Sequence, residues 1–306
     1  MYDAKTILLV CLALVAVAFV VFWVRAIVAT TRTPDASSPD GRIAPTPYQM
    51  FVGAVTDFFD TLGVGSFATT TALYRWGRSV SDELIPGTLN VGHTIPTVAQ
   101  AFIYTQIVEV DPWTLIWMIL AAVAGAWLGA GVVSSWSKQR VQVGMGIALL
   151  AAAVVILLRV LKLLPAGGDA LALSGAWLVV GLAGNFVLGM LMTLGIGLYA
   201  PCMILVSLLG MNPTAAFPIM MGSCAFLMPV ANVQFVNNRR YSLRAALGLT
   251  LLGTPAVFAA AFLVKSLELD TVRWLVVVVV LYTAITMLLA GRRTATSVSS
   301  VAGGTS

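Results

Sequence analysis

The chain has 306 residues, of which 59% are hydrophobic and 9% are charged. Soluble domains carry about 25% charged residues, so this chain cannot cover a single core with a polar surface. The composition excludes a soluble enzyme, a secreted domain and a disordered protein, and it predicts an all-α polytopic membrane protein. The excess of five positive charges is expected to orient the membrane segments, and we expect no nucleic-acid partner.

About 20 helical residues cross the hydrocarbon core of a bilayer, and several apolar segments reach that length. The candidate segments are residues 7–29, 48–74, 84–106, 112–136, 141–163, 171–209, 213–237, 244–265 and 272–290. A cleaved signal peptide is the alternative for residues 7–24, but the preceding residues are scarcely basic and no A-x-A site follows. We therefore expect a retained N-terminal transmembrane helix at 1–29, a linker at 30–47, and a disordered cytoplasmic tail at 292–306.

An internal repeat divides the remaining chain. The sequence TLGVGSFA at 61–68 recurs as TLGIGLYA at 193–200, at an offset of 132 residues that Pro86 and Pro218 share. Two further apolar segments follow each proline-containing segment. The pattern predicts a duplication into a first repeat at 48–164 and a second at 165–291, each of four elements, with the N-terminal helix added in front.

Segments 48–74 and 171–209 are too long for one simple span, and each has a Gly-x-Gly that weakens the helix near its middle. Each is either one long kinked helix or a re-entrant segment. If all segments cross, the 17 Lys and Arg residues divide 10 to 7, whereas two re-entrant segments divide them 12 to 5. The larger group is Arg25, Arg32, Arg42, Arg75, Arg78, Lys138, Arg140, Arg239, Arg240, Arg244, Arg292 and Arg293, and the smaller is Lys5, Arg159, Lys162, Lys265 and Arg273.

Cytoplasmic loops carry the excess of Lys and Arg, so the 12-to-5 division is the better topology. It inverts the second repeat relative to the first, with each repeat opening in a broken or re-entrant helix. The chain would then start outside and end in the cytoplasm.

Three titratable residues lie within apolar segments and are candidates for proton coupling. Asp57 and Asp60 are spaced i, i+3 and so share one helix face, and carboxylates inside a membrane segment mark an ion or proton path by default. The alternative places them near the membrane surface, solvated. His93 can exchange protons near neutral pH, and its alternative role is a hydrogen-bonded packing residue.

The Gly-x-Gly turns predict an anion site. A helix that restarts after a break presents unpaired N–H groups and its positive dipole end, and an oxyanion is the natural ligand there. The alternative is that these glycines permit close helix packing. The residues predicted to bind the anion from this pattern are Gly63, Gly65, Ser66, Thr69, Gly195, Gly197 and Tyr199.

The cysteines and the histidine do not predict a metal or redox site. Cys11, Cys202 and Cys224 all lie in apolar stretches, and the chain has a single histidine. We expect no disulfide framework, metal ion, cofactor or catalytic residue, and we interpret Cys202 and Cys224 as small buried residues rather than reactive thiols.

Two further motifs resemble the TauE/SafE sulfite-exporter family, also called the toluene-sulfonate uptake permeases. They are QIVEVDPW at 106–113 and GAWLGA at 125–130, and the resemblance extends over about residues 48–290. It departs at the family signature G-x-G-G-G followed by proline, because 63–66 and 195–198 each keep only two glycines. Only the second copy has a proline nearby, Pro201, and the resemblance adds it to the predicted anion-binding residues.

The resemblance implies export or uptake of sulfite, sulfonates or related organosulfur anions. We therefore predict a multi-pass permease of the cell (inner) membrane, not an enzyme, that moves a small anion by alternating access with the anion at the broken-helix N-termini. Its partners would be the anion and the lipid bilayer, with protons as a coupling ion and a homo-oligomer left open. The alternatives are a membrane-embedded thiol-dependent sulfur-transfer enzyme and a non-transporting accessory membrane protein.

Overall fold

The computed structural model describes residues 3–32, 43–81, 84–133, 168–192 and 197–265, with isolated residues between 143 and 161 and between 271 and 289. This described part is helical apart from one isolated bridge between Ala170 and Met211, which confirms the all-α class. Its elements are α1 (Ala4–Arg32), α2 (Pro47–Thr61), α3 (Ser66–Trp76), α4 (Ile85–Ile107), α5 (Pro112–Val133), α7 (Gly175–Met192), α8 (Tyr199–Leu208), η1 (Pro213–Ala215), α9 (Ala216–Asn237) and α10 (Leu243–Lys265).

The helix boundaries differ slightly from those expected. α1 continues to Arg32, past the expected end at residue 29, because its apolar and helix-compatible residues run on without a glycine or proline. The expected segments 141–163 and 272–290 lie largely outside the described residues, and the tail at 292–306 lies wholly outside them.

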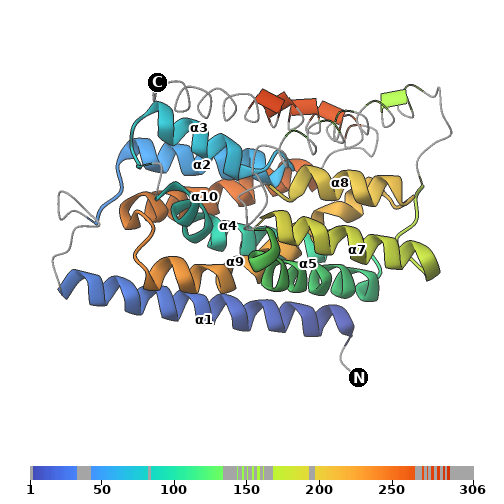
Figure 1. The fold of residues 1–306 in the computed structure, drawn as a ribbon, viewed down its shortest axis with the longest axis horizontal. Helices are drawn as coiled ribbons and strands as arrows, with labels where there is room; N and C mark the ends of the chain where they lie inside the picture. The colour runs from blue at the N-terminus through green and yellow to red at the C-terminus, as the bar shows by residue number, and fades with distance from the viewer. Residues whose placement is uncertain are drawn as a thin grey trace, which may run out of the picture.

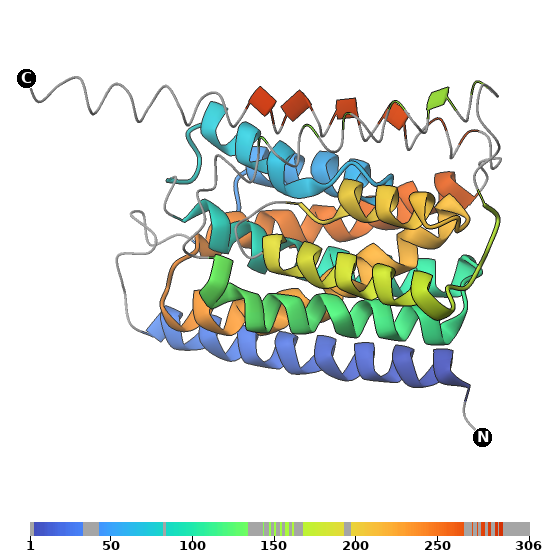
Figure 2. The same cartoon turned by 45° about the vertical axis from the view of Figure 1, so that its right-hand side comes forward.

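Four helical stretches in the described part are long and apolar enough to cross a membrane: Ala4–Ala29, Gly175–Met192, Pro213–Asn237 and Leu243–Leu263. α1 lies along the outer edge of the molecule in both views (Figures 1 and 2). Its outward side chains are apolar, with Leu14 65% and Val17 61% exposed. An apolar exterior of this extent is suited to lipid rather than water.

The first broken segment folds back on itself as a helix hairpin. Thr46 and Gln49 form a capping box that starts α2, and the left-handed φ values of Gly63 (95°) and Gly65 (82°) break the helix at residues 62–65. The hydroxyl of Tyr48, at the start of α2, donates to the carbonyl of Leu73 near the end of α3 at 2.6 Å. The two arms are therefore antiparallel, and we call α2, residues 62–65 and α3 the first hairpin.

The second broken segment also folds back. The segments that flank it meet where Asn212 N–H donates to the Ala170 carbonyl at 2.8 Å. Farther in, a Cβ built on Gly184 of α7 would lie 2.8 Å from Leu205 Cδ2 of α8. The chain therefore returns to its point of entry, and we call α7 and α8 the second hairpin.

The two hairpins open at opposite ends of the molecule, as Figure 1 shows with α2 and α3 on the left and α7 and α8 on the right. At the first hairpin's open end, the Tyr74 hydroxyl donates to the Ala245 carbonyl at 3.2 Å. Trp23 Nε1 of α1 donates there to the Tyr241 hydroxyl at 3.3 Å. The described arginines of this end, named here the arginine end, are Arg25, Arg75, Arg78, Arg239, Arg240 and Arg244.

The opposite end has a different charge. There Lys5 Nζ donates to the Gln106 carbonyl at 3.4 Å, and Asp111 N–H donates to the Leu171 carbonyl at 2.9 Å. The acidic residues described at this end are Asp3, Glu109, Asp111 and Asp169. The described arginines thus lie at one end of the bundle, and the described acidic residues other than Asp57 and Asp60 lie at the other.

Each hairpin packs its long arm on a helix from the other part of the chain. α2 lies mainly against α10, and α7 mainly against α5, while α4 and α9 cross between them. Glycines permit the close approach: a Cβ on Gly53 of α2 would lie 2.7 Å from Leu249 Cα of α10. On the other side, Gly125 of α5 lies directly against the Phe186 carbonyl of α7.

We expect Gly125→Val to destabilise the protein, because the added side chain meets backbone that cannot move aside cheaply. Overpacking of this kind costs about 1–3 kcal/mol, which lowers the melting temperature by several degrees. Thermal unfolding in detergent measures it. Leu120→Val is the matched control, because Leu120 lies on the same helix and is 49% exposed. Equal melting temperatures for the two variants would contradict the close crossing.

Candidate functional site

A network of buried polar side chains occupies the middle of the molecule, where the hairpin ends meet α4. Its members come from α2, α3, α4 and α8, and none is more than 6% exposed. They are Asp57, Asp60, Thr61, Ser66, Thr70, His93, Gln100, Tyr104 and Tyr199. Burial of so many polar groups in an apolar bundle is tolerated only when they are hydrogen-bonded.

Asp60 is bonded to the restarted helix of the first hairpin. The Ser66 backbone N–H, at the first residue of α3, donates to Asp60 Oδ1 at 2.5 Å. The N-cap position, Gly65, has no side chain to cap the helix, so the carboxylate takes that role from six residues away in the sequence. The α3 N-terminus therefore binds an oxyanion, and in this structure the oxyanion is the protein's own carboxylate.

Gln100 of α4 connects the two hairpins. Its Nε2 donates to Asp60 Oδ2 and to Thr61 Oγ1, each at 2.9 Å. Its Oε1 accepts from the hydroxyl of Tyr199, the first residue of α8, at 2.9 Å. One amide group thus connects the last turn of α2, in the first hairpin, to the start of α8, in the second.

The apolar side of the same junction brings the hairpins into direct contact. A Cβ built on Gly63 would lie 3.1 Å from Met203 Sδ of α8. Tyr104 stacks on Phe217 at 5.0 Å between ring centroids, and its hydroxyl donates to the Thr61 carbonyl at 2.9 Å. These contacts hold the break of the first hairpin against α8 and α9.

Asp57, His93 and Thr70 form a second line of hydrogen bonds. His93 Nδ1 lies 2.7 Å from Asp57 Oδ1, and His93 Nε2 lies 3.0 Å from Thr70 Oγ1. The three residues come from α2, α4 and α3, so the line joins both arms of the hairpin to α4. Asp57 Oδ2 has no hydrogen-bond partner and faces Gly253 of α10, where a Cβ would collide with it.

This centre carries a net negative charge unless protons are bound to it. It contains two carboxylates and one imidazole, and no lysine or arginine is among the buried side chains of the described residues. Two like charges at low dielectric repel strongly and lose their hydration. Protons are therefore the natural way to balance charge when this centre is to hold a further anion.

The structure separates the predicted residues into three groups. Asp57, Asp60, His93, Ser66 and Tyr199 are in the buried network, so the alternative of two solvated aspartates near the surface is wrong. Gly63 and Gly65 form the first break, and Pro201 lies buried in the first turn of α8. Gly197 precedes α8, whereas Gly195 lies outside the described residues.

Thr69 is placed differently from the prediction. Its hydroxyl donates to the Ser66 carbonyl at 2.9 Å and the Gly65 carbonyl at 3.3 Å, which uses the donor within its own helix. The neighbouring Thr70 contacts His93 instead. The threonine of α3 that reaches the centre is therefore Thr70, one position later than expected.

Sequence reasoning missed Thr61, Thr70, Gln100 and Tyr104. The signal for Gln100 was present, because it lies seven residues after His93 and so on the same face of a helix. Thr61 and Thr70 carried no such signal, since single threonines are common in membrane helices and satisfy themselves on their own backbone.

These observations define the class of the protein. It is an α-helical membrane protein with several spans, an apolar exterior, and a buried titratable centre where two broken helices meet. The sequence matches the family described as sulfite exporter TauE/SafE over residues 2–156, half of the chain, and the chain belongs to this family of transporters. No curated protein and no solved structure gives a match.

The matched region differs in its bounds from the resemblance seen in the motifs. Residues 2–156 include α1 and run through α5, whereas the motifs suggested a resemblance over 48–290 with the N-terminal helix added in front. The motifs could not reveal this, because α1 is a uniform run of apolar residues without a distinctive pattern. α1 is thus part of the region that carries the family pattern.

Proposed function

We propose that the chain transports a small oxyanion, sulfite or an organosulfonate, across the cell (inner) membrane together with protons, and that it is not an enzyme. The observation that carries the proposal is the carboxylate of Asp60 on the Ser66 N–H at the start of α3. A carboxylate and a sulfite or sulfonate group present similar oxygen atoms to a backbone donor. The helix end that binds one therefore has the chemistry to bind the other.

Proton coupling follows from the sign of the charges around this helix end. An incoming anion meets Asp57 and Asp60, and the described buried side chains supply no lysine or arginine to offset them. Protonation of Asp60 would free the Ser66 N–H for the substrate and remove the repulsion at the same time. The Asp57–His93 pair would hold the second proton, because its two heteroatoms are 2.7 Å apart and can share one.

Alternating access is supported by the arrangement of the hairpins. They open at opposite ends and meet at Gln100, which is bonded to Asp60 in the last turn of α2 and to Tyr199 at the start of α8. This is the layout expected of inverted repeats with a central site. α2 of the first half packs on α10 of the second half, and α7 of the second half packs on α5 of the first. Each half thus contributes a helix to the other in a corresponding position, as inverted repeats do. We propose that the first repeat at 48–164 and the second at 165–291 rock against each other around this centre.

The thiol-dependent enzyme is the less favoured alternative. Cys224 Sγ lies 3.6 Å from Met192 Sδ, and a thioether is too weak a base to remove the thiol proton. Cys202 is fully buried. Neither thiol has the exposed, electropositive surroundings that reactive cysteines require.

Uptake of radiolabelled sulfite into proteoliposomes tests the proposal. We expect saturable uptake that an imposed pH gradient accelerates, with competition by sulfonates and none by a neutral sulfone of similar size. Protein-free liposomes correct for passive leak. Sulfite flux equal to that of protein-free liposomes, from protein shown to be folded by its thermal unfolding, would reject the transport proposal.

The topology gives a separate prediction. Because the arginine end should be cytoplasmic, Arg78→Cys and Arg240→Cys are expected to react with a membrane-impermeant maleimide from the same side, and Glu109→Cys from the other. Lys138→Cys tests the loop at 138–140, which lies outside the described residues. Cys11→Ser removes the exposed native thiol. Labelling of the 138–140 and 239–244 loops from opposite faces would contradict the inverted arrangement.

A further inference from the structure

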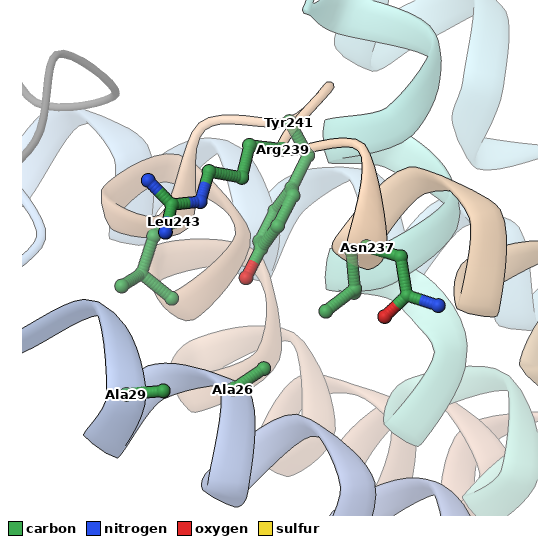
Figure 3. Close-up of a pocket in the computed structure, with 7 residues that line it drawn as sticks. Ala26, Ala29, Asn237, Arg239, Tyr241 and Leu243 are labelled. Carbon is green, nitrogen blue, oxygen red and sulfur yellow. The ribbon is translucent and has the colours of Figure 1, made fainter.

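A small cavity lies at the arginine end, away from the central network. It has a volume of about 220 Å³, is open on one side, and is bordered by the last turns of α1 and α9 and the first turn of α10 (Figure 3). Its lining combines three polar side chains with apolar ones: Ala26, Ala29, Val236, Asn237, Arg239, Tyr241 and Leu243. We propose that this cavity binds the phosphate-bearing headgroup of an anionic phospholipid.

The polar lining offers donors suited to a phosphate. The guanidinium of Arg239 and the hydroxyl of Tyr241 both border the space above α1, with the amide of Asn237 on the other side (Figure 3). Tyr241 accepts the indole N–H of Trp23, which leaves its own O–H as a donor. Burial raises the pKa of Tyr241 above its ordinary value, so this donor stays protonated throughout the physiological range.

The N-terminus of α10 adds an electrostatic field that favours an anion in the cavity. Leu243 lines the cavity and is the first residue of α10, a helix of 23 residues. The positive end of its dipole therefore lies beside the space, where it favours a negative group. Arg25, Arg240 and Arg244 are the sequence neighbours of the lining residues Ala26, Arg239 and Leu243.

The position of the cavity along α1 favours a lipid as the source of the phosphate. α1 has 29 residues, which at 1.5 Å per residue is about 44 Å and longer than the hydrocarbon core of about 30 Å. Ala26 and Ala29 lie in its last two turns, where the helix passes from the hydrocarbon core to the headgroups. Basic pockets between membrane helices at this level are recognised sites for anionic lipids.

Small side chains on α1 leave the space that forms the cavity. Ala26 and Ala29 are spaced i, i+3 on one face of α1, and both border the cavity opposite Tyr241 (Figure 3). The volume of about 220 Å³ corresponds to on the order of seven water molecules at about 30 Å³ each. A phosphodiester group fits this space, with the acyl chains passing along the outside of α1.

The test is thermal stabilisation of the detergent-purified protein by added phosphatidylglycerol, with native mass spectrometry to count bound lipids. We expect phosphatidylglycerol to bind and raise the melting temperature and phosphatidylcholine to do so much less. Arg239→Gln should weaken phosphatidylglycerol binding at least about fivefold. Arg78→Gln is the matched control, because Arg78 is at the same end and shares the left-handed backbone of Arg239, with φ of 47° and 52°.

A second variant keeps the test independent of charge. Ala26→Leu fills the cavity and leaves every arginine in place, so it should also weaken binding. Equal loss in Arg78→Gln and Arg239→Gln, or unchanged binding in Ala26→Leu, would overturn the proposed site. Equal stabilisation by glycerol phosphate at the same concentration would show a site for soluble phosphates and overturn the lipid assignment. None of these outcomes depends on the transport proposal.

Discussion

Asp57→Asn is expected to abolish the acceleration of sulfite uptake by a pH gradient while leaving the protein folded. Asparagine has the size of aspartate, and its amide oxygen can still accept from His93 Nδ1, the contact that Asp57 Oδ1 makes at 2.7 Å. The other carboxylate oxygen, Oδ2, has no partner, so an NH₂ group in its place breaks no hydrogen bond. The substitution therefore removes the carboxylate without breaking a hydrogen bond of the described residues.

Uptake with and without an imposed pH gradient measures this effect, and we expect the gradient-driven rate to fall at least about tenfold, equivalent to about 1.4 kcal/mol. His93→Gln should give the same loss, because it removes the other half of the pair. Ser223→Ala is the control: Ser223 is equally buried and polar but is not bonded to Asp57 or His93. Its hydroxyl donates to the Ile219 carbonyl at 2.7 Å and accepts from Asn185 Nδ2 at 3.2 Å. Its response to the gradient should match that of the parent.

Asp60→Asn has a second consequence, and this makes it a less clean test. Its amide NH₂ would face Gln100 Nε2, which now donates to Asp60 Oδ2. Gln100 cannot simply turn over, because its Oε1 accepts from Tyr199. We therefore expect Asp60→Asn to lower the melting temperature as well as the pH response. Unchanged gradient-driven uptake in Asp57→Asn, His93→Gln and Asp60→Asn together would reject proton carriage by all three residues.

The coarse fold was predictable because the membrane imposes it. Long uncharged segments must be helical to satisfy their backbone groups in lipid, and the helices in the described residues follow the expected segments closely. The breaks were predictable at Gly63 and Gly65, where left-handed φ values require glycine. Hydropathy could not distinguish a kinked helix from a hairpin, since both bury the same apolar residues; the decision came from the distribution of charge.

The central site was predictable only in part, because its residues are distant in sequence. Asp57, Asp60 and His93 were visible as titratable groups in apolar segments. Their pairing was not, since Asp57 and His93 are 36 positions apart and Asp60 bonds to a backbone N–H rather than to a side chain. A backbone donor carries no residue signature, so the capping of α3 by Asp60 could be found only in three dimensions.

Substitution of the glycines before the restarted helices, Gly65 and Gly197, is expected to have a large effect on anion binding. The two positions differ in how much a side chain disturbs the fold. Gly65 has φ of 82°, so any side chain there strains the backbone. Gly197 is not among the left-handed glycines of the described residues, which are Gly63, Gly65, Gly175 and Gly210. A Cβ on Gly197 meets no described heavy atom within 4 Å. Valine at 197 should therefore be compatible with the fold, and its effect on binding reports on the space in front of α8.

We expect Gly197→Val to weaken sulfite binding at least about tenfold, or about 1.4 kcal/mol, because its side chain occupies the space through which the anion approaches the N–H groups at the start of α8. A charge–dipole interaction there contributes about 0.3–2 kcal/mol, so the loss is of the size that blocked access would produce. Calorimetric titration of monodisperse protein measures it. Gly125→Val should instead lower the melting temperature and leave the dissociation constant of the surviving folded protein unchanged. If Gly197→Val and Gly65→Val both bind sulfite as the parent does, the anion site lies elsewhere and these glycines serve only the turns.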